Sequence, residues 1–416
     1  MTIELTIDHL RKPLQIGSKH APNRVVYQPT ESNTADGDGN VSDTTLEKYV
    51  ELAKGKPGVL FVESLDVTRE TQARSNRLLI MKNNKKGLER LVGEIRRANG
   101  DAVVLFQLSH AGRLSDPSMK PPLFVYEPRA HLPGAAGLPA GGRVMRTDEI
   151  ERTKKEFVES AVVAYEAGAD GIDIKQAHGF VAGDFLHPAN RRPDGYGGSF
   201  ENRTRFFRET VSGIKKALGK AAVDGSFLIG TRISPYEGIM GGCGTSGPDD
   251  LEENLREMVL FARMIEDEGL HFINVSGGYA SGNLEILMPT AAYPEGVFRL
   301  FGWTRTIKEA VRIPVIGSGY SYLRDGENRL FGHDAEKKSL LYWAEKNVRE
   351  GRTDLIGIGR QAIADPYFAV KALCGRQREI DYCTACGGCG FLLGNNRQVG
   401  CVVYDDRYKE IYRSLR

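Results

Sequence analysis

Four of the six cysteines lie close together near the end of the 416-residue sequence, in the pattern Cys383-x2-Cys386-x2-Cys389-x11-Cys401. Three thiolates two residues apart can wrap a compact polynuclear core, and the fourth returns after a short excursion, as in iron–sulfur proteins. Structural zinc is an alternative, although zinc sites more often pair one CxxC with a distant second CxxC. A third interpretation is that the four thiols bind no metal. Cys243 and Cys374 stand alone, and a disulfide framework is not expected in a chain of this size.

A lysine and a histidine three residues apart follow an apolar run, in Asp173-Ile-Lys-Gln-Ala-His178-Gly179. If the run is a strand, Lys175 and His178 straddle its end and can face one pocket. There they would stabilise negative charge that develops on a carbonyl or carboxylate oxygen. A surface lysine beside a hydrogen-bonded structural histidine is the alternative. A Schiff-base aldolase using Lys175 is a remote alternative, because it has no use for four clustered cysteines.

Two glycine pairs indicate a phosphorylated ligand. They are Gly317-Ser-Gly319-Tyr320 and Gly357-Ile-Gly359-Arg360, each following a short apolar run. In a barrel, the loops after the seventh and eighth strands commonly bind phosphate through backbone amides, and an arginine can add a bidentate contact. Gln107 and Arg232 also end predicted strands. An amide and a guanidinium aimed at one pocket suit a planar heterocycle, although Arg232 in a structural ion pair is the alternative.

Eight apolar segments alternate with segments of helical period, which predicts the elements that position these residues. The expected strands are Arg24–Gln28, Val59–Glu63, Val103–Leu108, Gly171–Lys175, Leu228–Ile233, Phe272–Val275, Pro314–Gly317 and Asp354–Ile358. The expected helices are Thr44–Lys54, Gly87–Ala98, Thr147–Ala167, Glu201–Leu218, Asp249–Glu268, Thr304–Val311, Lys337–Glu350 and Asp365–Leu373. This order predicts a TIM (β/α)8 barrel over residues 1–375, followed by a cysteine-rich extension over 376–416. A doubly wound sheet with an appended domain is the alternative.

Composition excludes several classes of protein. The chain is 41% hydrophobic and 26% charged with a net charge of +2, so neither nucleic acid nor a membrane surface is an expected partner. No apolar stretch is long enough to cross a bilayer, and the N-terminus lacks the pattern of a signal peptide. We therefore expect a cytoplasmic protein that acts on a small molecule. Whether it forms a homo-oligomer is left open.

Several motifs together resemble the old yellow enzyme class of FMN oxidoreductases. They are Asn23-Arg-Val-Val-Tyr-Gln-Pro29-Thr30, Phe106-Gln-Leu-Ser-His-Ala-Gly-Arg113, the run from Asp170 to Phe206 with His187-Pro-Ala-Asn190, Arg232-Ile-Ser-Pro, and Gly357-Ile-Gly-Arg-Gln-Ala-Ile-Ala-Asp365-Pro366. The resemblance covers about residues 5–375. It implies FMN over the barrel mouth, held by Pro29, Thr30, Ser64, Gln107, Arg232, Gly319, Tyr320, Gly359 and Arg360. It also implies that Lys175 and His178 grip the activating oxygen of an unsaturated substrate while flavin N5 delivers hydride to the β-carbon.

The sequence departs from that class at two positions. Lys175 stands where many members have histidine, and Phe180 stands where the usual tyrosine donates a proton to the α-carbon. Phenylalanine has no proton to give. Tyr279, Tyr27 or solvent would therefore supply it, or the reaction differs from simple enone reduction.

The cysteine motif resembles the one that ligates a [4Fe–4S] cluster beside FMN in the trimethylamine dehydrogenase and 2,4-dienoyl-CoA reductase branch. Members of that branch normally continue into further nucleotide-binding domains, and no convincing GxGxxG motif is present here. Electrons are therefore expected from a redox partner protein through the cluster or from NAD(P)H at FMN. The predicted function is reduction of an activated C=C bond, with an FMN/Fe–S dehydrogenase or an electron-transfer subunit of a larger complex as the alternative.

Overall fold

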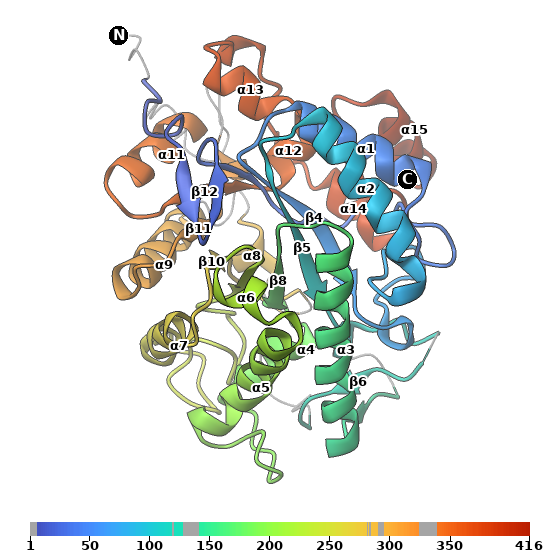
Figure 1. The fold of residues 1–416 in the computed structure, drawn as a ribbon, viewed down its shortest axis with the longest axis vertical. Coiled ribbons are helices and arrows are strands. Elements are labelled where there is room, and N and C mark those ends of the chain that lie inside the picture. Colours follow the sequence, from blue (N-terminus) through green and yellow to red (C-terminus); the bar gives the residue numbers. More distant parts are fainter. Residues whose placement is uncertain are drawn as a thin grey trace.

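The fold comes from a computed structural model, which describes residues 6–118, 120–127, 141–280, 282, 284–289, 295–323 and 339–416. Eight parallel strands form a closed barrel in the order β10-β11-β12-β3-β4-β5-β8-β9 (Figure 1). Their bounds are β3 (Val25–Tyr27), β4 (Val59–Asp66), β5 (Val103–Ser109), β8 (Gly171–Gln176), β9 (Leu228–Ile233), β10 (Phe272–Val275), β11 (Val315–Gly317) and β12 (Leu355–Ile358). Each lies at a predicted strand, so the TIM barrel is confirmed.

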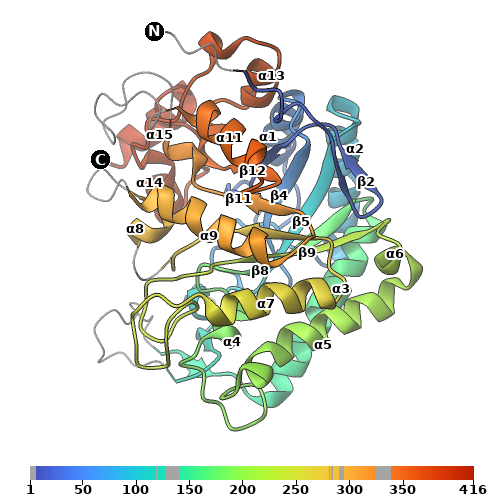
Figure 2. The same ribbon diagram turned by 90° about the vertical axis from the view of Figure 1, so that its left-hand side faces the viewer.

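A helix follows each barrel strand and packs outside the barrel, as Figure 2 shows for α7, α9 and α11. The helices are α1 (Asp43–Lys54), α2 (Lys85–Ala98), α3 (Thr147–Glu166), α5 (Phe200–Leu218), α7 (Arg256–Asp267), α9 (Gly296–Ala310), α11 (Leu340–Arg349) and α13 (Phe368–Leu373). Shorter elements are α4 (Val181–Leu186), α6 (Lys220–Val223), α8 (Leu284–Leu287) and α12 (Arg360–Ala364), with β6 (Leu123–Phe124) and β7 (Arg143–Val144) in the loop after β5. In the part of the chain that the structure describes, no helix is both long and apolar enough to span a membrane.

Two predicted helices begin far from their predicted first residues, and α13 begins at Phe368 and not at the predicted Asp365. The acidic start at Asp249 does not begin a helix, because Gly241 N–H donates to the Asp250 carbonyl and Asn254 N–H donates to the Gly244 carbonyl, which folds this segment as a loop. Helix α7 begins only at Arg256. Helix α9 begins at Gly296, earlier than the predicted Thr304, because its buried residues continue toward the N-terminus through Leu300 and Val297.

The barrel interior is apolar at the amino ends of the strands and polar at their carboxyl ends. The apolar layer joins inward side chains of the strands to a hairpin, β1 (Leu14–Ile16) and β2 (Lys19–Ala21). It contains Ile16, Ala21, Val26, Val59, Phe61, Val103, Leu105, Leu228, Phe272, Ile316 and Leu355. Because inward residues alternate along a strand, the next inward positions are Gln28, Gln107, Asp173 and Asn274. The polar groups therefore converge at the end where barrel enzymes place their active sites.

The C-terminal extension contains α14 (Gly388–Gly394) and α15 (Asp406–Ser414). It contacts the loop after β3, where Val399 N–H donates to the Ser32 carbonyl and Asn33 donates to the Arg397 carbonyl. It also contacts α12, where Cys383 N–H donates to Gln361 at 2.8 Å. Since β3 and β12 are neighbouring strands, the extension packs beside the mouth of the barrel.

Candidate active site at the barrel mouth

Four polar side chains from different strands form one hydrogen-bonded group inside the mouth. Gln28 and Asn274 exchange two hydrogen bonds of 2.8 and 2.9 Å between their amides. Asp173 accepts from Gln107 at 3.0 Å and from Asn274 at 3.4 Å. Burial, partly offset by Arg232, raises the pKa of Asp173 to about 6. This group fixes the side chains that line the mouth.

Some atoms of this region are buried and unpaired. Gln107 Oε1 and Arg232 Nε have no hydrogen-bond partner among the described residues, although Gln107 is fully buried and Arg232 is 9% exposed. Leaving such groups unpaired costs about 1–3 kcal/mol each, so a ligand that supplies a donor to Gln107 and an acceptor to Arg232 would relieve it. The polar edge of a flavin offers both kinds of group. The structure thus brings Gln107 and Arg232 to the barrel mouth beside Asp173, and their unpaired atoms fit the polar edge of FMN.

Lys175 is 4% exposed and its ammonium group has three neighbours. It donates to Ser64 Oγ at 3.0 Å and to Glu31 Oε1 at 3.2 Å, and it lies 3.5 Å from the centre of the Phe180 ring. Burial, only partly offset by Glu31, lowers the pKa of Lys175 to about 8. Lys175 is therefore a cation at neutral pH that lies close to its titration point.

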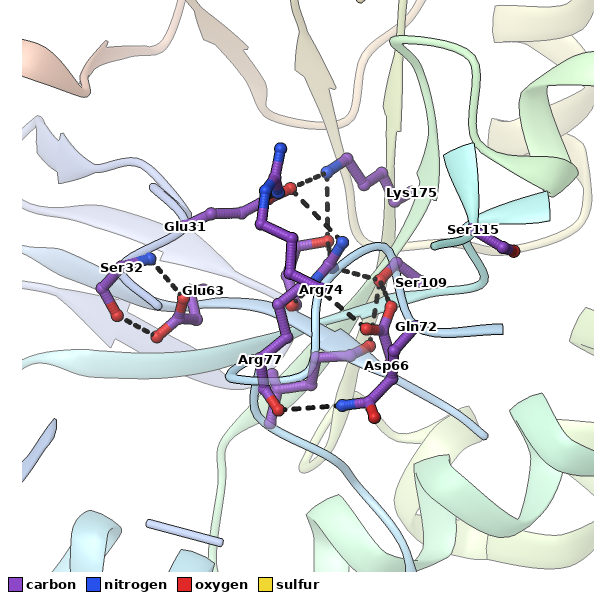
Figure 3. Close-up of polar contacts among 12 residues, drawn as sticks. Glu31, Ser32, Glu63, Asp66, Gln72, Arg74, Arg77, Ser109, Ser115 and Lys175 are labelled. Atoms are coloured by element: carbon purple, nitrogen blue, oxygen red, sulfur yellow. Dashed lines mark hydrogen bonds and ion pairs between the residues drawn. The ribbon is translucent and has the colours of Figure 1, made fainter. Parts of the chain in front are cut away.

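Glu31 belongs to a buried charge network that links Lys175 to Arg77 (Figure 3). Arg77 is completely buried, with its Nε 3.1 Å from Asp66 Oδ2 and its Nη2 2.9 Å from the Ser64 carbonyl. Burial alone would raise the pKa of Glu31, but Arg77 and Lys175 hold it far below its usual value. Sequence reasoning missed this network because Glu31 and Arg77 lie in the loops after β3 and β4, while Lys175 lies in β8, so no local motif joins them.

His178 adopts a left-handed backbone conformation, with φ of 66°. Its Nε2 lies 2.8 Å from Ser276 Oγ, which also accepts from Arg232 at 3.2 Å. Burial, together with the charges of Arg232 and Lys175, lowers the pKa of His178 well below its ordinary value. The imidazole is thus neutral at neutral pH and can donate one hydrogen bond without adding charge.

Tyr279 lies beside His178 and Tyr27 does not. A β-bridge pairs Tyr279 with His178, and a Cβ on Gly179 would approach the Tyr279 ring to 2.8 Å. The Tyr279 hydroxyl donates to Asp184 at 3.0 Å, and Asp184 accepts from Arg113 at 2.6 Å. The Tyr27 hydroxyl instead bonds the backbone of α13 and its preceding loop, in the layer between barrel and helices. Of the two tyrosine candidates for a proton donor, only Tyr279 is near the site.

Next to Tyr279, His187, Glu237 and Cys243 form a buried group with the chemical types of metal ligands. His187 Nε2 lies 2.6 Å from Glu237 Oε2, and its Nδ1 lies 2.7 Å from Tyr126 Oη. Two ligand atoms on one zinc ion would be about 3.4 Å apart, from Zn–N and Zn–O bonds near 2.1 Å. The shorter contact marks an ion pair, in agreement with the pKa of His187, which Glu237 raises well above normal against the effect of burial.

The two glycine-containing loops present backbone at the mouth. Gly319 has φ of 103°, and Gly359 N–H donates to Ser321 Oγ at 3.2 Å. The Tyr320 side chain points away, since its hydroxyl accepts from Asn347 and its ring packs on Phe301. Only the backbone of Tyr320 can therefore face a phosphate. Pro29 is buried beside this region, and a Cβ on Gly359 would lie 3.2 Å from Thr30 Cγ2.

All four clustered cysteines line one pocket, which confirms that the fold brings them together. The pocket is lined by Arg360, Ile363, Ala364, Cys383, Thr384, Ala385, Cys386, Gly387, Cys389, Cys401, Val402 and Val403. Four cysteines around one pocket are a donor set that fits an iron–sulfur cluster and also structural zinc. Burial raises the pKa of Cys389 to about 11, so this thiol needs a metal to become a thiolate at neutral pH. Arg360, expected at the phosphate, points its side chain to this pocket.

Comparison with known proteins agrees with this geometry. A sequence profile of the NADH:flavin oxidoreductase / NADH oxidase family matches residues 9–277. The chain is 33% identical to an NADH oxidase of Thermoanaerobacter brockii, over 94% of this chain and 54% of the relative. It is 29% identical to an NADPH dehydrogenase of Bacillus pumilus, over 84% of this chain and 90% of the relative. A structure of 2-naphthoyl-CoA reductase with 2-naphthoyl-CoA shares the fold. It superposes with a TM-score of 0.80 at 24% identity, over 98% of this chain and 58% of that chain. The chain spans about half the length of several curated relatives that it matches.

Proposed function

Because the chain belongs to the NADH:flavin oxidoreductase / NADH oxidase family, we propose that it is an FMN-dependent enzyme that reduces an activated C=C bond. The observation that carries the proposal is the buried, unpaired polar edge of Gln107 and Arg232 beside Lys175 and His178. The first pair would hold the pyrimidine edge of FMN and the second pair the substrate oxygen. Family membership also removes the aldolase alternative.

The remaining contacts to FMN follow from the loops around the mouth. Pro29, Thr30 and Ser64 would lie along the ring system, and the backbone of Gly319, Tyr320 and Gly359 would bind the phosphate, with Arg360 close by. FMN would supply hydride at its N5. Lys175 would donate a charge-assisted hydrogen bond to the substrate carbonyl, and His178 a neutral one, so that both stabilise the enolate-like charge.

Proton transfer to the α-carbon would fall to Tyr279. Phe180 cannot donate, and its ring instead covers the Lys175 ammonium group. Asp184 accepts from the Tyr279 hydroxyl while Arg113 neutralises Asp184. Asp184 and Arg113, which do not themselves react, thus hold the hydroxyl in one orientation near Gly179.

Electrons would reach FMN by one of two routes. A redox partner protein would reduce a [4Fe–4S] cluster bound by Cys383, Cys386, Cys389 and Cys401, or NAD(P)H would reduce FMN directly. Four cysteines around one pocket support the cluster. An electron-transfer subunit would carry the same cofactors but show no turnover of small unsaturated substrates.

The test is an anaerobic absorbance spectrum of the purified protein with FMN, iron and sulfide quantified, followed by assays with 2-cyclohexenone and cinnamate in which NADPH or sodium dithionite supplies the electrons. We expect flavin and about four iron atoms per chain. Cys389→Ser should lose the iron, whereas Cys374→Ser, which changes an exposed cysteine outside the pocket, should keep it. Flavin with no iron would refute the cluster, and iron with no flavin would refute the FMN assignment. Flavin and iron without turnover of any enone or unsaturated acid would favour the electron-transfer subunit.

A further inference from the structure

Among the described residues that line the cysteine pocket, Arg360 is the only one with a positively charged side chain. It is the first residue of α12, directly after the glycine loop that follows β12. Its guanidinium carbon lies 4.0 Å from the centre of the Tyr322 ring. This stacking fixes the guanidinium plane, so the group does not sample many orientations.

One nitrogen of this guanidinium is buried and unsatisfied. Arg360 Nη2 makes no hydrogen bond to any residue for which the structure gives a placement. A buried charged donor without an acceptor is strongly unfavourable. Arg360 nevertheless lines the pocket that four cysteines share, and its charge interacts with those of Cys383 and Cys389. Thiolates and inorganic sulfides are acceptors for such a donor.

We propose that Arg360 Nη2 donates a hydrogen bond to a sulfur atom of the [4Fe–4S] cluster and thereby raises its reduction potential. The inference rests on the cluster assigned under the proposed function. Reduction adds one electron, taken from a low-potential one-electron donor, to a group that four thiolates already make anionic. A fixed positive charge stabilises the more negative, reduced form more than the oxidised form. Arginine remains protonated throughout, so no proton accompanies the electron.

This role differs from binding the FMN phosphate, which the sequence predicted for Arg360. The Gly359 backbone lies at the mouth of the barrel while the side chain of the next residue reaches the cysteine pocket. Two adjacent residues thus connect the proposed flavin site with the proposed cluster site. The positive charge would favour residence of the electron on the cluster before it passes to the flavin.

The experiment is a redox titration of the purified holoenzyme, with sodium dithionite as the electron donor and the reduced cluster followed by electron paramagnetic resonance. Arg360→Gln should keep its iron and sulfide but make the cluster about tenfold harder to reduce, a fall of about 59 mV for a one-electron couple. Arg360→Lys keeps the charge and should recover part of the shift. Arg397→Gln removes one charge from an exposed position outside the pocket and should leave the potential unchanged.

Every other outcome either supports or overturns the proposed contact between Arg360 and the cluster. An Arg360→Gln cluster with the wild-type potential would overturn the inference, and so would loss of FMN alone, which would assign Arg360 to the phosphate. An equal shift in Arg397→Gln would also overturn it, because the effect would then be general charge. Loss of iron in Arg360→Gln but not in Arg360→Lys would support contact between the charge and the cluster. Wild-type protein with flavin but no iron would refute the cluster itself and leave the FMN assignment standing.

Discussion

At the scale of one residue, the surroundings of Lys175 hold a buried ammonium group in place and set its pKa. The ammonium group would be costly to bury alone, and Glu31, Ser64 and the Phe180 ring compensate part of that cost. Burial outweighs them and brings the pKa of Lys175 to about 8. A substrate carbonyl that replaces one of these partners would meet a donor already oriented and only partly neutralised.

The first prediction concerns pH. The charged form of Lys175 exists below its pKa of about 8 and is lost above it, so the rate of hydride transfer to substrate should fall as the pH rises through that value. Lys175→Met should lower the rate about 10²–10³-fold, as for loss of one oxyanion donor. Lys175→Arg, which stays charged, should extend activity to higher pH. Single-turnover oxidation of the reduced flavin measures this, and an unchanged alkaline limb in Lys175→Arg would contradict it.

A second residue-scale prediction concerns the proton donor. Tyr279→Phe should lower kcat about 10²–10⁴-fold if Tyr279 is the general acid. Phe180→Tyr restores a phenol close to Lys175 and should recover much of the activity in the double variant. Steady-state kinetics of the two single variants and the double variant measure both effects. If Tyr279→Phe retained full kcat, solvent or another group would have to be the donor.

At the scale of elements, the barrel strands could be predicted because each is a short apolar run that is buried on both faces. The predicted strand Leu228–Ile233 has the bounds that the structure shows. Helix starts were less accurate, as at Asp249, where loop hydrogen bonds outweigh the acidic signal. Side-chain directions cannot be predicted from the sequence, so it does not distinguish Tyr27 from Tyr279 as a donor, nor does it indicate that Arg360 lines the cysteine pocket. The ion pair of His187 and Glu237 joins two loops and leaves no trace in local sequence.

Strand β12 gives an element-scale prediction at Gly357. A Cβ at Gly357 would lie 2.0 Å from Gln28 Nε2 and 2.9 Å from the Gly317 carbonyl. Gly357→Ala should therefore displace Gln28, lower FMN content and destabilise the fold by about 1–3 kcal/mol. The matched control is Gly302→Ala on α9, where nothing lies within 4 Å, and it should stabilise the protein by about 1 kcal/mol. Chemical denaturation and flavin quantification test both, and a Gly357→Ala variant with full FMN would contradict the crowding.

For the whole molecule, the open question is how strongly the barrel and the extension depend on each other. The division at residues 375 and 376 stays a prediction. All eight barrel strands end by Ile358, so the closed sheet uses no residue of the extension. The contacts between them include hydrogen bonds at Ser32, Asn33 and Gln361 on one side of the mouth. Asn76 and Asp365 add hydrogen bonds, and Ile380 of the extension packs into the main hydrophobic core. The arrangement therefore allows the extension to lose structure while the barrel keeps its own.

Loss of the cluster is thus expected to leave the barrel folded and able to bind FMN. In Cys389→Ser, the pocket would lose one of its four ligands, and the extension should loosen because metal binding contributes to the folding of such segments. The main thermal transition should move by no more than about 4 °C, since about 1 kcal/mol shifts the Tm of a large domain by ~2–4 °C. Circular dichroism and the FMN-to-protein ratio measure this beside Cys374→Ser. A joint loss of FMN and a Tm lowered well beyond that range would instead mean that barrel and extension unfold as one cooperative unit.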